Sequence, residues 1–170
     1  MYCIDLFPTC FRVPEMNKCI KEEDLNATIR KKFFPGAKAS ELSHYILPAL
    51  NEFSPDSIIL HVGTNDLQSR NFEASSLANE VINIGTIAQA KGVNTVFISS
   101  ITTRKDKSFL QNRIDEVNNI LQNQCEENGF IYISNHSVLH EHVCNDGIHL
   151  LESGMCILAN NFISHLTNFL

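Results

Sequence analysis

This sequence lacks a long hydrophobic run, and it lacks an excess of positive charge. No apolar stretch approaches the roughly 18 residues that a membrane-spanning helix requires. Residues 1–11 contain no basic stretch followed by an apolar core, so we expect no signal peptide and a cytoplasmic location. The 13 lysines and arginines are outnumbered by 19 aspartates and glutamates, which gives a formal net charge of -6. Because nucleic-acid binders need basic surfaces to displace counterions from phosphates, we exclude a general nucleic-acid binder.

Repeats, low-complexity tracts and linkers rich in proline or glycine are also missing. Hydrophobic residues make up 44% of the chain and charged residues 19%, which is typical of a folded globular protein. We therefore expect a single domain over residues 1–170. The six cysteines follow no compact disulfide framework. Cys3, Cys125 and Cys156 lie in or beside apolar runs, where we expect buried, reduced thiols.

Short apolar runs alternate with longer segments of helical periodicity. Continuous apolar runs are typical of parallel strands covered on both faces, and the spacing i, i+3, i+4, i+7 is typical of amphipathic helices. Strand, helix and strand repeated in this way predict a five-stranded, three-layer α/β domain, with parallel strands and helices on both faces. The expected strands are 2–6, 29–34, 57–62, 95–98 and 130–133, and the expected helices are 15–25, 42–50, 77–88, 110–121 and 158–169.

Unusual polar clusters follow three of the expected strands. Residues 34–37 (Phe-Pro-Gly-Ala) follow the second strand, and residues 63–66 (Gly-Thr-Asn-Asp) follow the third. A histidine-rich loop ending at residues 146–150 (Asp-Gly-Ile-His-Leu) follows the fifth. In an open parallel sheet, ligands bind outside the carboxyl ends of the strands. We therefore expect these three loops to meet on one rim and to form the functional site.

Four residues in these loops suit acyl-transfer chemistry. Asp146 lies three residues before His149, a spacing that lets the carboxylate reach the imidazole ring. A carboxylate on one ring nitrogen fixes the tautomer, so the other nitrogen can act as a base. The amide of Asn65 is a neutral donor for an oxyanion, and Gly36 lets a backbone N–H approach the same oxyanion.

These three motifs, in this order, resemble the second, third and fifth blocks of the SGNH (GDSL-type) hydrolase superfamily. The resemblance implies a flavodoxin-like fold and hydrolysis of acyl or acetyl esters by a Ser-His-Asp triad, without a metal or other cofactor. It implies that His149 is the base, that Asp146 orients it, and that Gly36 and Asn65 supply oxyanion-hole donors. The expected partner is a small-molecule ester or acetylated ligand. Residues expected to contact that ligand are Asp5, Thr64 and Asp66.

The first block of the superfamily, Gly-Asp-Ser, is missing from the chain. The best match by position places Ile4 at the glycine, Asp5 at the aspartate and Leu6 at the nucleophilic serine. Leucine has no nucleophilic atom, so covalent catalysis at Leu6 is impossible. We therefore predict a ligand-binding pseudoenzyme that is inactive or strongly impaired. An incomplete or decayed gene is one alternative, and an active hydrolase in which His149 and Asp146 activate water is another. A relocated nucleophile is the third, at Cys3, Thr9 or Cys10.

Other polar side chains near the rim have plainer interpretations. His140, His142 and Cys144 could join the Asp and His of the fifth motif in a zinc site, but we favour solvent-exposed loop histidines. His61 lies inside the third strand, where we expect it to be buried and hydrogen-bonded across the sheet. Asp66 is expected to cap the helix that follows it, rather than to position the neighbouring amide.

Overall fold

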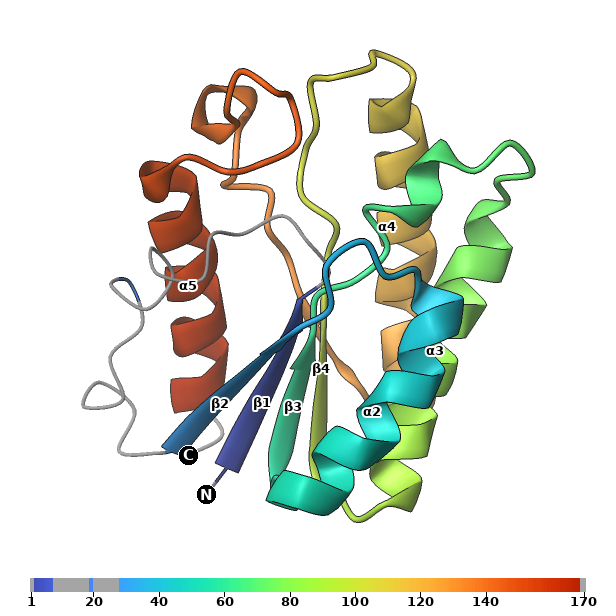
Figure 1. Ribbon diagram of the computed structural model, residues 1–170, viewed down its shortest axis with the longest axis vertical. Coiled ribbons are helices and arrows are strands. Elements are labelled where there is room, and N and C mark those ends of the chain that lie inside the picture. The colour runs from blue at the N-terminus through green and yellow to red at the C-terminus, as the bar shows by residue number, and fades with distance from the viewer. Residues whose placement is uncertain (1, 8–18, 20–27, 169–170) are drawn as a thin grey trace.

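The computed structural model describes residues 2–7, 19 and 28–168, and a parallel β-sheet forms its centre (Figure 1). The strand order is β2-β1-β3-β4-β5, and every neighbouring pair is parallel. This order places β1 inside the sheet. Because every pair is parallel, all carboxyl ends lie at one edge. The strands are β1 (Tyr2–Phe7), β2 (Thr28–Phe33), β3 (Ser57–Leu60), β4 (Thr95–Ser99) and β5 (Ile131–Ile133).

Helices cover both faces of the sheet (Figure 1). Of the four helices α2 to α5 in the described residues, three pack on one face and one packs on the other. The three are α2 (Ala39–Phe53), α3 (Ala74–Ala90) and α4 (Leu110–Asn128), and the single helix is α5 (Glu152–Thr167). Within the described ranges, no helix combines the length and the apolar character needed to cross a membrane.

Strands β3 and β4 are buried on both sides, as their continuous apolar sequences predict. In β3, Ile58 and Leu60 belong to the core shared with α2, α3 and α4, whereas Ile59 belongs to the core shared with α5. None of these three side chains has exposed surface. Burying such a side chain contributes about 1.5–3 kcal/mol, so both helix layers stabilise the same strand. The predicted α/β class, with a parallel sheet between helices, is confirmed.

The apolar periodicity located four of the expected helices. The helices α2, α3, α4 and α5 bury most of the stripes predicted for them. The exceptions are Tyr45 of α2, which is 49% exposed, and Phe169, which lies outside the described residues. The helix expected within 15–25 falls outside the described residues, apart from Cys19. Thr9 and Cys10, two alternatives for a relocated nucleophile, also lie outside them.

The cysteines agree with the sequence prediction at one position and differ at another. Cys125 is free and buried, and burial raises the pKa of its thiol to about 12. Cys156 forms a disulfide bond with Cys19, so the expectation of a reduced thiol at Cys156 is wrong. The two cysteines are 137 residues apart in sequence, and the fold brings their Cα atoms to 5.1 Å. Because spacing does not determine disulfide connectivity, only the fold could reveal this pair.

Candidate active site

The loops that carry the second and third motifs begin at the carboxyl ends of β2 and β3. Residues 34–38 connect β2 to α2, and residues 61–65 follow β3. Leu6, at the expected nucleophile position, lies one residue before the end of β1, and Asp5 precedes it in the same strand. Because β1 pairs with both β2 and β3, the backbone of Leu6 lies between these two loops.

Gly36 and Asn65 are linked through Ala37. Gly36 has a φ of 76°, a left-handed conformation that favours glycine. Its turn is closed by a hydrogen bond of 3.1 Å from the backbone N–H of Ala37 to the carbonyl oxygen of Phe34. The side chain of Asn65 donates a hydrogen bond of 3.0 Å from Nδ2 to the carbonyl oxygen of Ala37. The two residues expected to supply oxyanion donors are therefore joined across the end of β1.

Asp66 begins the short 3-10 helix η2 (Asp66–Gln68) and caps a different helix from the one expected. Its Oδ2 accepts a hydrogen bond of 3.2 Å from the backbone N–H of Ala39, the first residue of α2. The expectation that Asp66 caps the following helix is therefore wrong, because the carboxylate satisfies an N–H at the start of a helix that precedes it. Burial raises the pKa of Asp66 from 3.8 to about 6.

Asp146 and His149 are hydrogen-bonded to one another. Nδ1 of His149 lies 2.7 Å from Oδ2 of Asp146. The other carboxylate oxygen accepts hydrogen bonds from the backbone N–H groups of Ile148 (2.9 Å) and His149 (3.0 Å). The bond from Ile148, followed by those from the backbone and ring of His149, lowers the pKa of Asp146 from 3.8 to about 2. The carboxylate is therefore charged at neutral pH.

This pair, which we call the Asp–His dyad, is arranged to act as a base. A carboxylate on Nδ1 holds the proton of the neutral ring at that nitrogen, so Nε2 is the basic atom. The side chains of His149 and Asp146 are 46% and 49% exposed. The ring is therefore open to a hydroxyl group or a water molecule, from which it could take a proton.

A segment that carries none of the three motifs lies against the loop of Asn65. Residues 101–106 follow β4, and we call them the β4 strap. Arg104 in this strap is only 3% exposed and binds both carboxylate oxygens of Asp106, at 2.9 Å and 2.8 Å. Its Nη1 also donates a hydrogen bond of 2.7 Å to the carbonyl oxygen of Thr64, which is itself buried. Because Arg104 and Thr64 are 40 residues apart, no local sequence signal indicated this contact.

The β4 strap also holds the loop of the Asp–His dyad. The backbone N–H of Lys105 donates a hydrogen bond of 3.0 Å to the carbonyl oxygen of Gly147, and its Nζ donates one to the carbonyl oxygen of Val143. Gly147 has a φ of 77°, and a Cβ atom there would lie 2.4 Å from the backbone nitrogen of Asp106. Glycine is therefore required for this close approach. The strap therefore connects the loop of Asn65 to the loop of the Asp–His dyad.

His61 is a structural residue, as its place in an apolar strand predicts. Its ring is 4% exposed, and Nδ1 lies 2.8 Å from the hydroxyl of Ser99 on β4. Burial lowers the pKa of His61 to about 4, so the ring is neutral under physiological conditions. Ser99 in turn accepts a hydrogen bond from Asn135. The prediction of a buried histidine bonded across the sheet is confirmed.

The histidine-rich loop contains the short helix η3 (His140–His142). Among the described residues, no group of three or more His, Cys, Asp or Glu side chains is arranged to hold a metal ion. Nδ1 of His142 accepts a hydrogen bond of 3.0 Å from the backbone N–H of Leu139, and Nε2 lies 3.7 Å from the carboxylate of Glu141. The ring of His142 therefore closes its own turn.

Comparison with protein families gives one match that spans most of the chain. Residues 24–155 match the sequence model of the GDSL-like Lipase/Acylhydrolase family. The matched range contains Gly36, Asn65 and both residues of the Asp–His dyad. Comparison with curated proteins finds no significant match.

Several solved structures share the fold. The structure of TesA is similar with a TM-score of 0.83 and 14% identity, over 100% of both chains. A GDSL-like lipase from Bacteroides thetaiotaomicron has a TM-score of 0.80 and 12% identity, covering 99% of this chain and 89% of that one. A catalytic mutant of Axe2, an acetylxylan esterase from Geobacillus stearothermophilus, has a TM-score of 0.78 and 11% identity, covering 97% of this chain and 93% of that one. At these identities, the likeness establishes a common fold.

Proposed function

The chain belongs to the GDSL-like lipase/acylhydrolase family, and from this membership we propose that it is a pseudoenzyme that binds small acyl or acetyl esters. The ester carbonyl is placed between the donors of Gly36 and Asn65, and the ester group faces His149. Leu6 occupies the position of the family's serine and offers no nucleophilic atom. The chain is therefore expected to bind esters and to hydrolyse them far more slowly than a serine-dependent relative.

The observation that carries this proposal is the 2.7 Å hydrogen bond between His149 and Asp146. A base oriented by a charged carboxylate is the part of an ester hydrolase that accepts the proton of the nucleophile. The link between Gly36 and Asn65 through Ala37 supports an oxyanion site at the same edge of the sheet. We expect the base and the oxyanion site to bind an ester, and the missing serine to prevent its rapid hydrolysis.

Restoring the missing block tests this proposal directly. The double variant Ile4→Gly/Leu6→Ser introduces a hydroxyl at the proposed nucleophile position and removes the bulky side chain at the glycine position. We expect hydrolysis of p-nitrophenyl acetate to rise about 100-fold or more over the unchanged chain, because a serine beside a base opens a covalent route. The measurement is the initial rate for both proteins at equal concentration, after circular dichroism has shown that both are folded.

Two further variants complete that experiment. His149→Ala in the double variant should abolish the gain, whereas His44→Ala should leave it unchanged, because His44 is an exposed residue of α2. A folded double variant that gains no activity contradicts the position assigned to Leu6, and with it the pseudoenzyme proposal.

The intact dyad favours a second candidate function, slow hydrolysis with water as the nucleophile. Hydrolases whose catalytic triad has been removed still react roughly 10³- to 10⁴-fold faster than the uncatalysed reaction in water, through the oxyanion hole and substrate binding. If the dyad activates water, the unchanged chain hydrolyses p-nitrophenyl acetate above the buffer rate, and His149→Ala loses that excess. An excess rate that survives the loss of His149 contradicts this mechanism, and no excess rate leaves the pseudoenzyme as the better description.

A further inference from the structure

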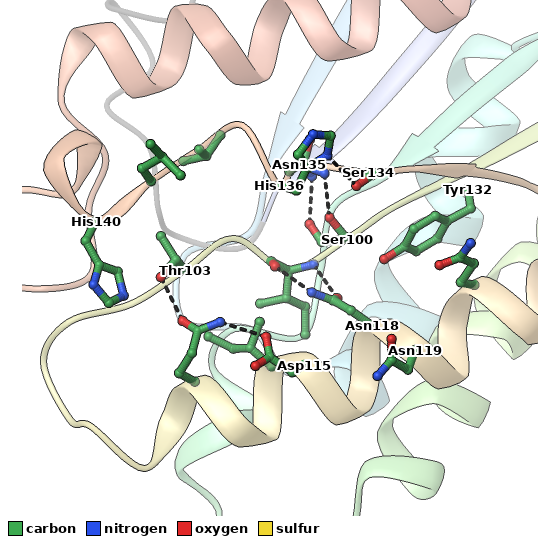
Figure 2. A pocket seen from close by; sticks show the side chains of 16 residues that line it. Ser100, Thr103, Asp115, Asn118, Asn119, Tyr132, Ser134, Asn135, His136 and His140 are labelled. Carbon is green, nitrogen blue, oxygen red and sulfur yellow. Dashed lines mark hydrogen bonds between the residues drawn. The ribbon is translucent and has the colours of Figure 1, made fainter.

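A large hollow lies between α4 and the segment that follows β5 (Figure 2). Its volume is about 790 Å³, within the range of ligand-binding pockets. None of its 16 lining residues belongs to the Asp–His dyad or to the expected oxyanion site. The hollow is therefore a separate feature of the molecule, and an inference about it does not depend on the proposed function.

Two walls face one another across this hollow. One wall is a polar stripe on α4, from which Asp115, Asn118 and Asn119 project (Figure 2). Such a stripe would be an ordinary solvated helix face if nothing lay opposite it. Here Tyr132 of β5 and the residues at 134–136 and 138–140 form a second wall. The polar stripe therefore forms one side of an open groove.

Several polar groups that line the hollow are held in place by hydrogen bonds within the protein. Asn118 forms two hydrogen bonds of 2.9 Å with the backbone N–H and carbonyl of Ile101. Thr103 donates a hydrogen bond of 2.7 Å to Gln111, which donates one of 2.8 Å to Asp115. Nδ2 of Asn135 donates to the hydroxyl of Ser99 and to the backbone carbonyl of Ser100. A fixed set of polar groups reduces the ordering cost of binding a ligand.

Two amides in the same wall are not held in this way. In the described part of the chain, no hydrogen bond joins the side chain of Asn119 or Gln122 to another protein group. Both residues line the hollow, and both are exposed. Each amide offers two N–H donors and one carbonyl acceptor. Asn119 and Gln122 are therefore the groups best placed to bind a ligand in the hollow.

The lining selects a neutral ligand rich in hydroxyl groups. Five of the 16 lining side chains are amides, four carry hydroxyl groups and two, His136 and His140, are imidazoles, whereas none is lysine or arginine and one, Asp115, is a carboxylate. Amides and hydroxyls both donate and accept hydrogen bonds, as sugar hydroxyls do. The missing lysine and arginine disfavour phosphate and carboxylate ligands. Tyr132 and Leu139 add apolar surface against which the C–H face of a sugar ring can pack.

From these contacts we propose that the hollow beside α4 binds a neutral oligosaccharide. Asn119, Gln122 and Asp115 hydrogen-bond its hydroxyl groups, and Tyr132 packs against a ring face. The carboxylate of Asp115 accepts hydrogen bonds from sugar hydroxyls and repels anionic sugars. The site lies at the carboxyl ends of β4 and β5, and Thr103 joins it to the β4 strap.

Isothermal titration calorimetry of the full chain tests this proposal. The neutral probes are maltotetraose, cellotetraose and tetra-N-acetylchitotetraose, and the anionic probe is tetragalacturonate. We expect saturable binding of at least one neutral probe, and weaker or no binding of the anionic one. The double variant Asn119→Ala/Gln122→Ala should weaken binding about tenfold, because it removes the two amides that have no protein partner. Both residues are exposed, so the variant should remain folded.

Asn123→Ala is the matched control, because Asn123 is an exposed asparagine of α4 outside the hollow. Its affinity for the neutral probe should equal that of the unchanged chain. In NMR titrations, the side-chain amide signals of Asn119 and Gln122 should shift on addition of the probe. Failure of all three neutral probes to bind, equal affinity in the double variant, or a preference for tetragalacturonate would each overturn the proposal.

Discussion

The partly buried position of Asp66 disfavours the ionised form of its carboxyl group in the folded protein. Burial raises its pKa from 3.8 to about 6, so the folded protein binds this proton more tightly than the unfolded chain. The free energy of unfolding should therefore fall as the pH rises from about 4 through about 6. In Asp66→Asn the amide oxygen can still accept the hydrogen bond from Ala39, but the charge is gone. We expect this variant to be more stable than the unchanged chain at pH 7.5, by on the order of 1 kcal/mol after allowance for solvent screening.

Urea denaturation at pH 4.0 and pH 7.5 measures this difference. The advantage of Asp66→Asn should disappear at pH 4.0, where the carboxyl is protonated in the folded state. Glu116→Gln serves as the control, since Glu116 is an exposed residue of α4 for which we expect no comparable difference between the two pH values. A variant that is less stable than the unchanged chain at pH 7.5 would show that the charge itself stabilises the start of α2.

The β4 strap is a connecting segment with a clear structural role. Arg104 neutralises Asp106 and binds the carbonyl oxygen of Thr64 in a site that is almost completely buried. Removing one partner of a buried ion pair leaves the other charge without compensation, which costs about 3–5 kcal/mol. We therefore expect Arg104→Ala to lower the free energy of unfolding by about 3 kcal/mol, measured by urea denaturation at neutral pH.

The chain offers an exposed ion pair for comparison. Lys32 and Glu52 lie 3.0 Å apart, with side chains 35% and 57% exposed. Exposed pairs of this kind contribute about 0–1 kcal/mol, so Lys32→Ala should cost far less than Arg104→Ala. Equal losses in the two variants would mean that the strap does not depend on its buried arginine.

The contrast between helices and strap explains which elements could be predicted from the sequence. A helix such as α4 is recognised because its buried residues, among them Ile114 and Leu121, repeat along the chain itself. The strap has no periodicity, and the partners of Arg104 include a residue 40 positions away. Its sequence is indistinguishable from that of a solvated loop until the fold brings these residues together. The Asp–His dyad, by contrast, could be predicted from the sequence because Asp146 and His149 are only three residues apart.

At the scale of the whole molecule, the alternation of strands and helices predicted the layered architecture and the edge where the motifs gather. It did not predict the hollow beside α4, because the two walls come from separate segments, α4 and the residues after β5, and no local pattern gives the distance between them. It also did not predict which cysteines pair. Both features depend on the distance between segments far apart in sequence, which local patterns do not encode.

The disulfide bond between Cys19 and Cys156 closes a covalent ring over residues 19–156, with one tail (residues 1–18) before it and another (residues 157–170) after it. Strands β2 to β5 and helices α2 to α4 belong to the closed ring, whereas β1 belongs to the tail that precedes it. Yet β1 lies between β2 and β3, which are both parts of the ring. Both neighbours of β1 therefore belong to the ring, and the N-terminal tail supplies the strand that pairs with them. Leu6, the position assigned to the missing serine, lies on β1 and therefore outside the covalent ring.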